Sequence, residues 1–178
     1  MTLSLKTLIP ALAFGLAGSC ASTPDATSPL PAQSDANVEL SKAEKVTALL
    51  NSFNKGDTAP IAFINAEKYT QHNLTDADGL AGFVEVMQNA PPQGFSADVK
   101  RVFTDGDYVV AHTEYNFFGP KAGFDVFRFE DGLIVEHWDN LTEITPPNPS
   151  GRTQFDGAIE VTDLDQTEAN KLLVQEFV

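Results

Sequence analysis

The hydrophobic pattern of the chain changes its period once, near residue 95, and this change limits the folds that the sequence can adopt. Before it, apolar residues recur at helical spacing, as in Val46, Leu49 and Phe53. After it, apolar and polar residues alternate, which is typical of strands with one buried face. Helices followed by an antiparallel sheet predict an α+β domain, with the helices packed on one face of a curved sheet.

Capping and turn residues set the expected element boundaries. Ser41 and Glu44 form a capping box, Gly56 ends the first helix, and Asp78 caps the third. The expected helices are residues 41–56, 58–64 and 78–90. The expected strands are residues 95–103, 108–118, 124–129 and 133–142, with a short extended piece at 68–72 and a loop at 119–123.

The N-terminal segment has the pattern of a secretory signal peptide. Lys6 precedes an apolar run at residues 8–17, shorter than the roughly 20 residues of a permanent span. Small residues lead from this run to Cys20, the only cysteine. This junction resembles the bacterial lipobox, so we expect removal of residues 1–19 and lipidation of Cys20. The alternative is an ordinary signal peptide with an incidental cysteine.

The residue after this cysteine bears on the destination of the protein. Ala21 resembles the sorting rule of Gram-negative lipoproteins, which implies an outer-membrane anchor that faces the periplasm. The formal net charge of −14 argues against nucleic acid and anionic lipid headgroups as partners. We therefore expect membrane contact through the lipid anchor only. With one cysteine and no intramolecular disulfide, a hydrophobic core must hold the domain together.

Composition divides the chain into five segments. These are residues 1–19 (signal peptide), 20–37 (lipidated tether rich in Pro, Ser and Ala), 38–145 (folded domain), 146–164 (linker) and 165–178 (amphipathic helix). The sequence of residues 172–177 is similar to that of residues 48–53 in the first helix. We interpret the last helix as the start of a truncated second repeat; the alternative is a C-terminal helix that docks on its own domain or on a dimer partner.

Three stretches carry a family resemblance. Residues 69–73, 106–112 and the hairpin 124–139 resemble, in this order, the SnoaL-like branch of the nuclear-transport-factor-two-like (ketosteroid isomerase-like) superfamily. The resemblance covers roughly residues 40–145. It implies a cone-shaped barrel, in which a curved antiparallel sheet wraps on three N-terminal helices. It says little about the reaction, because this fold carries isomerases, cyclases, hydrolases and binding modules.

The resemblance also implies roles for single residues. Asp125 with Arg128 matches the Asp-x-x-Arg strand that carries the oxyanion-hole aspartate of ketosteroid isomerases. Their base aspartate corresponds to His72, and their helix tyrosine falls near Leu49. Loss of that tyrosine argues against steroid isomerisation. SnoaL-type cyclases likewise act by proton transfer without a cofactor, so no cofactor is expected.

The hairpin turn decides which residues face the pocket. A three-residue loop at 130–132 gathers the ionisable groups on one face, whereas a two-residue Asp131-Gly132 turn puts Trp138 beside Asp125. We prefer the three-residue loop for that reason. One face then carries Asp125, Phe127, His137 and Asp139, and the other Phe124, Val126, Ile134 and Trp138. We expect Tyr69, Phe127, Trp138 and Asp139 to bind the ligand.

The three histidines, His72, His112 and His137, lie on predicted strands and can each be aimed inward. A histidine would accept a proton from a carbon next to a carbonyl, and a protonated Asp125 would donate to the enolate oxygen. The alternative is that each histidine is a satisfied strand residue. Three histidines and a carboxylate also suit zinc or iron. No close His-x-His or His-x-x-x-His pair is present, so no metal is expected.

Two functions follow from this site. The first is cofactor-free acid–base catalysis (isomerase, cyclase or aldol-type) on a small apolar carbonyl compound. The second is a non-catalytic module of the same fold that binds a small ligand or a protein. An enclosed pocket with Asp125 in hydrogen-bond reach of a histidine favours the first, and a pocket filled by its own side chains favours the second. A homodimer through the sheet face is expected in either case.

Overall fold

The computed structural model describes residues 39–178. The predicted signal peptide, the lipidation site Cys20 and the tether lie outside the described residues. Within residues 39–178, no helix combines the length and apolar character that crossing a membrane requires.

Helix α1, Lys42–Lys55, has the predicted ends. Ser41 and Glu44 form both hydrogen bonds of the capping box, and Gly56 adopts φ 61°, a left-handed conformation that favours glycine. The second expected helix is a 3₁₀ turn, η1, Ala59–Phe63. Helix α2, Gly79–Gln88, begins after Asp78, whose carboxylate does not cap it. Asp78 instead accepts a hydrogen bond from the backbone N–H of Gln71 at 2.8 Å.

The sheet has five strands in the order β1-β5-β4-β3-β2. They are β1 (Thr70–Gln71), β2 (Ser96–Asp105), β3 (Tyr108–Asn116), β4 (Pro120–Glu130) and β5 (Leu133–Glu143). Strands β2 to β5 pair antiparallel as predicted, whereas β1 runs parallel to β5, so the sheet is mixed. The predicted loop 119–123 is wrong, because β4 already starts at Pro120.

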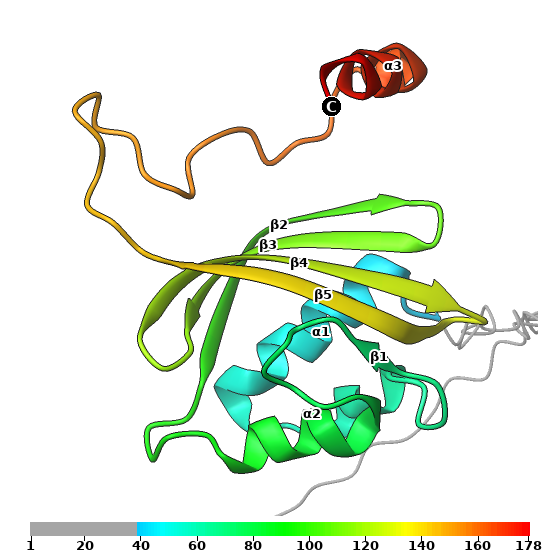
Figure 1. Cartoon of the computed structure of the whole chain (residues 1–178), viewed down its shortest axis with the longest axis vertical. Coiled ribbons are helices and arrows are strands. Elements are labelled where there is room, and N and C mark those ends of the chain that lie inside the picture. The colour runs from blue at the N-terminus through cyan, green and yellow to red at the C-terminus, as the bar shows by residue number, and fades with distance from the viewer. Residues whose placement is uncertain (1–38) are drawn as a thin grey trace, which may run out of the picture. The chain divides into compact units, whose positions relative to one another are not determined.

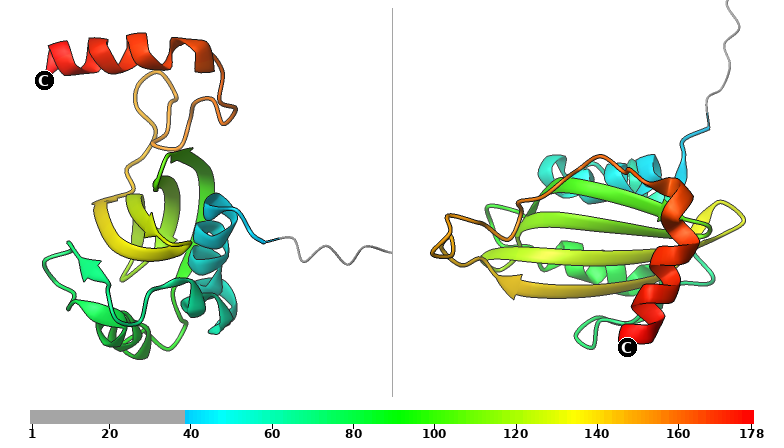
Figure 2. Two further views of the ribbon diagram at one scale, coloured as in Figure 1. Left: turned by 90° about the vertical axis from the view of Figure 1, so that its right-hand side faces the viewer. Right: turned by 90° about the horizontal axis from the view of Figure 1, so that it is seen from above.

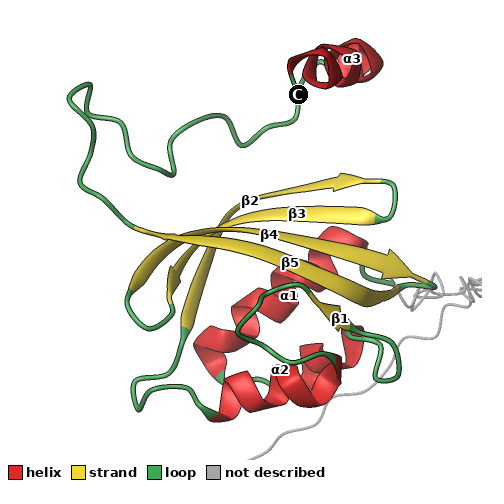
Figure 3. Ribbon diagram, viewed as in Figure 1, coloured by secondary structure: helices red, strands yellow, loops and turns green. Residues whose placement is uncertain are grey.

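Helices α1 and α2 cover one face of the curved sheet, which we call the inner face (Figures 1 and 3). Figure 2 shows the strands curving around α1. Val46, Leu49 and Leu50 of α1 are fully or almost fully buried against inner-face strand residues. The α+β prediction, with helices first and a curved sheet wrapped on them, is confirmed. The outer face of the sheet points away from these helices.

The hairpin between β4 and β5 differs from the preferred prediction. Glu130 pairs with Leu133 across a two-residue turn, in which Asp131 and Gly132 both have positive φ. The three-residue loop is therefore wrong. A bulge at Val135, which has no partner on β4, shifts the register by one residue.

The bulge restores the side-chain arrangement that the wrong loop had suggested. Beyond it, Phe127 pairs with His137, and Asp125 pairs with Asp139, so all four lie on the inner face as predicted. Ile134 lies before the bulge and pairs with Phe129 in the core. The prediction that Ile134 shares the face of Trp138 is therefore wrong.

The C-terminal part contains η2, Leu164–Gln166, and α3, Thr167–Phe177. The expected helix is thus present, and Leu172, Leu173 and Phe177 on it are exposed. Residues 146–164 are not a free linker throughout, since Arg101 of β2 donates a hydrogen bond to the carbonyl of Phe155 at 2.6 Å. That α3 opens a second repeat stays a prediction.

Candidate functional site

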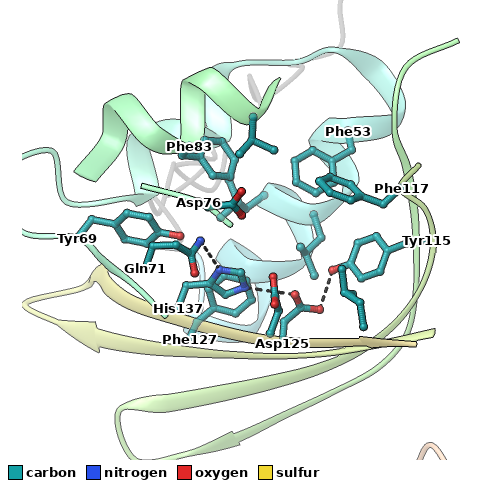
Figure 4. Close-up of a pocket in the computed structure, with 15 residues that line it drawn as sticks. Phe53, Tyr69, Gln71, Asp76, Phe83, Tyr115, Phe117, Asp125, Phe127 and His137 are labelled. Atoms are coloured by element: carbon teal, nitrogen blue, oxygen red, sulfur yellow. Dashed lines mark hydrogen bonds and ion pairs between the residues drawn. The ribbon is translucent and has the colours of Figure 1, made fainter. Parts of the chain in front are cut away.

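A cavity of about 70 Å³ lies between the inner face, α1 and α2 (Figure 4). One part of its lining is apolar, and the other part carries hydroxyl, amide, imidazole and carboxylate groups. The apolar lining is Leu49, Leu50, Phe53, Phe83, Val86, Phe117, Phe127 and Leu141. The polar lining is Tyr69, Gln71, Asp76, Tyr115, Asp125, His137 and Asp139. A pocket of this kind is a typical small-molecule site.

Asp125 is the buried carboxylate of this pocket, with 3% of its surface exposed. The Tyr115 hydroxyl donates to its Oδ2 at 2.6 Å, and His137 Nε2 lies 3.2 Å from its Oδ1. Figure 4 shows both contacts. Neighbouring strands β3 and β5 thus supply a partner to each oxygen of a carboxylate on β4. Asp125 thus lies within hydrogen-bond reach of a histidine, which is one of the two features expected to favour catalysis over binding alone.

Gly123 lets Tyr115 reach this carboxylate. A Cβ atom on Gly123 would lie 2.7 Å from the Tyr115 ring and 2.7 Å from a Leu141 methyl carbon, closer than carbon atoms approach. Only glycine therefore leaves room for the ring on the inner face. Burial and the nearby Asp125 charge raise the pKa of Tyr115 well above its usual value, so its hydroxyl remains a proton donor.

Gln71 determines which ring nitrogen of His137 carries the hydrogen. The Gln71 side-chain oxygen accepts a hydrogen bond from the backbone N–H of Asn73 at 3.0 Å, which turns the amide nitrogen toward His137 Nδ1, also at 3.0 Å. Assigned from this network, Nδ1 accepts and Nε2 carries the proton. His137 is then a neutral imidazole that donates to Asp125.

Two more carboxylates line the same pocket. Asp139 receives two hydrogen bonds from the side-chain amide of Asn73, one on each oxygen, at 3.0 Å. Among residues 39–178, the Asp76 carboxylate receives only a 3.4 Å contact from the adjacent Thr75 hydroxyl. Burial raises the pKa of Asp76, and the nearby charge of Asp139 raises it further.

Tyr69 is the least satisfied polar group of the pocket. It is 6% exposed, its hydroxyl points into the cavity (Figure 4), and none of residues 39–178 hydrogen-bonds to this hydroxyl. Burial, followed by the charges of Asp139, Asp76 and Asp125, raises its pKa above the usual value. The Tyr69 hydroxyl is thus protonated, and it neither donates nor accepts a hydrogen bond within residues 39–178.

His72 does not face the pocket, and the prediction that it is aimed inward is wrong. Gln71, the last residue of β1, lies beside His137 on the inner face, and the next residue, His72, points to the outer face. The His72 ring stacks on Trp138 at 4.3 Å, and its Nε2 lies 3.3 Å from a carboxylate oxygen of Glu136. Glu136 in turn pairs with Arg128 on the outer face. The expectation that Trp138 lines the ligand pocket is wrong for the same reason.

His112 also points away from the pocket, contrary to the prediction. It pairs with Phe124 on the outer face, stacks on that ring at 4.2 Å and is covered by Phe155 at 5.4 Å. Burial, and after it the charge of Arg101, lowers the pKa of His112, so the neutral form is favoured. Of the three histidines, only His137 lies in the pocket.

Several functional side chains were missed by sequence reasoning. Gln71 and Asn73 lie in a stretch that resembled the family, but their contacts with His137 and Asp139 were not foreseen. The hydroxyl contact of Tyr115 was not foreseen either, because it depends on the space that Gly123 leaves. Asp76 lies in a loop, where no alternation indicates the direction of a side chain.

Asp125, His137 and Asp139 also form a group that could bind a metal, since one ligand atom from each lies within 4.8 Å of the others. Zinc and iron accept such ligands. In the structure, each of these side chains already has protein hydrogen-bond partners. These bonds explain the arrangement without an ion, and the expectation of no metal stays a prediction.

Fold and site together define the class of the protein: an α+β domain whose pocket contains a hydrogen-bonded aspartate and histidine. The family model of the SnoaL-like domain matches residues 46–137, about half of the chain. The chain therefore belongs to the SnoaL-like family, and the matched range includes Asp125 and His137. No curated protein sequence matches the chain.

One solved structure with a TM-score above 0.5 supports the fold, and two others are similar to the chain at lower scores. A predicted ketosteroid isomerase from Kribbella flavida is 16% identical, with a TM-score of 0.51, over 67% of this chain and 90% of that one. A nuclear transport factor 2-like protein of unknown function from Cytophaga hutchinsonii is 17% identical, with a TM-score of 0.49, over 60% of this chain and 94% of that one. A predicted polyketide cyclase from Acidithiobacillus ferrooxidans is 23% identical, with a TM-score of 0.45, over 57% of this chain and 88% of that one. At these identities the likeness concerns the fold alone.

Proposed function

We propose that the pocket binds a small apolar carbonyl compound and transfers a proton at the carbon next to the carbonyl, without a cofactor. The observation that carries this proposal is Asp125, a buried carboxylate held by Tyr115 and His137 at the end of an apolar cavity. An oriented proton acceptor in an apolar site is what enolisation requires.

The hydrogen bonds reverse the roles that the sequence suggested. Because Tyr115 and His137 both donate to Asp125, we assign Asp125 as the proton acceptor and not as the donor. Asp125 takes the proton from the α-carbon, and the C–H electron pair moves into the enolate. The free hydroxyl of Tyr69 donates a hydrogen bond to the enolate oxygen. Asp125 then returns the proton to carbon, which completes an isomerisation or prepares a ring closure.

The alternative is a binding module with the same pocket. The cavity of about 70 Å³ is smaller than the roughly 150 Å³ cavity that admits benzene in another protein. Side chains of the protein thus fill much of the interior, which favours ligand binding without chemistry. The two functions differ in whether bound carbonyl compounds exchange their α-hydrogens.

The test uses butan-2-one in D₂O and follows loss of its α-hydrogen signal by NMR. Wild type should exceed the buffer rate. His137→Gln should lower the protein-catalysed rate at least about tenfold, because the donor that holds Asp125 is displaced. His72→Gln is the matched control on the outer face and should keep the wild-type rate. Binding of butan-2-one without exchange, or an equal loss in His72→Gln, would leave only the binding module.

Export is a separate part of the proposal and rests on residues outside the described range. The basic start, the short apolar run and Cys20 support a lipid-anchored protein at the outer membrane, facing the periplasm. Cys20→Ser should leave an unlipidated precursor that is lost from the membrane fraction. Normal fractionation of this variant would contradict the lipid anchor.

A further inference from the structure

We propose that the substrate of this pocket carries a protonated amino group, which binds at a second polar subsite formed by Asp76, Asp139 and Tyr69. This inference rests on the proposed function and refines its substrate class, from an apolar carbonyl compound to a carbonyl compound whose apolar body also carries an ammonium group. The subsite adjoins the contact between Asp125 and His137, where the proton transfer is assigned, because a carboxylate oxygen of Asp139 lies within 4.8 Å of ligand atoms of both residues.

The charges around the cavity support a cationic ligand. Among the described residues, its lining includes three carboxylates, Asp76, Asp125 and Asp139, and no lysine or arginine. Its one histidine, His137, is neutral by its hydrogen bonds. In a partly desolvated site such charges interact strongly with a bound ion. The pocket should therefore repel carboxylates and phosphates and attract ammonium groups.

Neither carboxylate of the subsite has a cationic partner in the part of the chain that the structure describes. Asp139 accepts from the neutral amide of Asn73, and Asp76 has only the long contact with Thr75. The charge of Asp139 also disfavours ionisation of Asp76. A cation next to both carboxylates would relieve this repulsion and replace the water that Asp76 loses on burial.

Tyr69 supplies an independent indication of a ligand. The Tyr69 residue is 94% buried, and its hydroxyl has no hydrogen-bond partner within residues 39–178, so this hydroxyl is available to a polar group of a ligand. It points into the cavity (Figure 4), and among the nearby charges those of Asp139 and Asp76 raise its pKa most. Its oxygen can accept from an ammonium N–H while its hydrogen donates to a carbonyl. One ligand with an amino group near its carbonyl would satisfy both.

The remaining walls restrict the body of this ligand. Phe53, Phe83 and Leu141 are apolar, and the cavity is small. They suit a short hydrocarbon chain. The substrate class is thus a small amino ketone or amino aldehyde, and not a carboxylic acid or a phosphate ester.

The test uses three probes of equal length: pentylamine, pentan-1-ol and pentanoate. Their dissociation constants are measured by NMR titration of the full-length protein at pH 7. Pentylamine should bind at least about tenfold more tightly than pentan-1-ol, because a charge-assisted hydrogen bond contributes that much or more. Pentanoate should show no saturable binding. Pentanoate affinity equal to that of pentylamine would overturn the proposal.

Variants locate the binding site. Asp76→Asn and Asp139→Asn should each raise the dissociation constant of pentylamine about tenfold and change that of pentan-1-ol by less than about twofold. Asp98→Asn makes the same charge change on the outer face, where Asp98 pairs with Lys100, and should not alter pentylamine binding. If Asp98→Asn weakened pentylamine binding equally, the amine would be attracted to the acidic surface as a whole, and the proposal would also be overturned. Thermal unfolding confirms that each variant is folded.

The two proposals can fail separately. Asp125→Asn should abolish α-hydrogen exchange and yet retain selectivity for pentylamine over pentanoate. Loss of this selectivity in wild type, with exchange intact, rejects the amino-group inference and leaves the proposed function. Selective amine binding without any exchange by wild type would reject the proposed function and, with it, the assignment of an amino carbonyl substrate.

Discussion

At the scale of single residues, the site depends on buried hydrogen bonds to Asp125. Tyr115→Phe removes the donor to Oδ2 and keeps the ring packed against Gly123. We expect a loss of about 2 kcal/mol in the free energy of unfolding, because a buried carboxylate loses a partner. Urea denaturation at pH 7 measures it.

The matched control is Tyr108→Phe. The Tyr108 side chain lies half exposed on the outer face, and no described residue hydrogen-bonds to its hydroxyl. This change should alter the free energy of unfolding by less than about 0.5 kcal/mol. Equal effects of the two substitutions would contradict a stabilising bond between Tyr115 and Asp125.

The same scale shows what the residues could and could not reveal. Alternation along the hairpin correctly grouped Asp125, His137 and Asp139 on one face. Alternation failed for His72 because β1 is only two residues long, and neither Gln71 nor His72 is apolar enough to fix its direction. The contacts of Gln71 and Tyr115 depend on rotamers and on neighbouring strands, which a single sequence does not contain.

At the scale of elements, the β4–β5 hairpin determines the position of His137. Its two-residue turn needs positive φ at Gly132, which is 79°. Gly132→Ala should cost about 1 kcal/mol, because a Cβ atom is strained in this conformation. The added Cβ would meet no side-chain atom closer than 3.6 Å, so backbone strain is the cause.

Chemical denaturation measures this loss as well. Asp131→Asn is the control, because asparagine tolerates positive φ, and it should change the free energy of unfolding by less than about 0.5 kcal/mol. An unchanged stability in Gly132→Ala would mean that the hairpin turn differs from the one described.

The bulge explains why the wrong three-residue loop still predicted the correct face of the sheet for Asp125, His137 and Asp139. Ile134 and Val135 are both apolar and both almost fully buried, which interrupts strict alternation. This pair is a signal in the sequence, but it is equally compatible with a strand buried on both faces. Capping residues were more informative, since α1 begins and ends where Ser41 and Gly56 predicted.

At the scale of the whole molecule, the C-terminal segment has two parts that differ in their contacts. Phe155 stacks on His112, whereas Ile159, Leu172 and Phe177 are 66%, 61% and 91% exposed. Deleting residues 159–178 removes little buried surface and two exposed ion pairs, of which only Lys171–Asp105 joins the segment to the sheet. It should shift the melting temperature by less than about 3 °C.

Deleting residues 150–178 also removes Phe155, uncovers His112 and should lower the melting temperature by several degrees more. Differential scanning calorimetry of both truncations makes the comparison. A large drop with the shorter truncation would show that α3 docks on this domain or on a partner. The truncated-repeat interpretation would then be wrong.

The expected homodimer also belongs to this scale. The outer face exposes Phe103, Tyr108 and Phe124, which are the kind of side chains that dimer interfaces bury. Dimerisation stays a prediction, and the molar mass in solution measures it. The family fold was accessible from the sequence because long alternating strands and capped helices carry strong patterns. The chemistry was less accessible, because it depends on contacts between distant segments.

The measurement that tests the central claim most directly is the α-hydrogen exchange rate of Asp125→Asn with butan-2-one. An amide in place of the carboxylate keeps the shape of the site and removes the proton acceptor. The account predicts a rate at least about a hundredfold below that of wild type, with butan-2-one still bound and the fold retained. A variant that is folded, binds the ketone and exchanges its α-hydrogens at the wild-type rate would contradict Asp125 as the base.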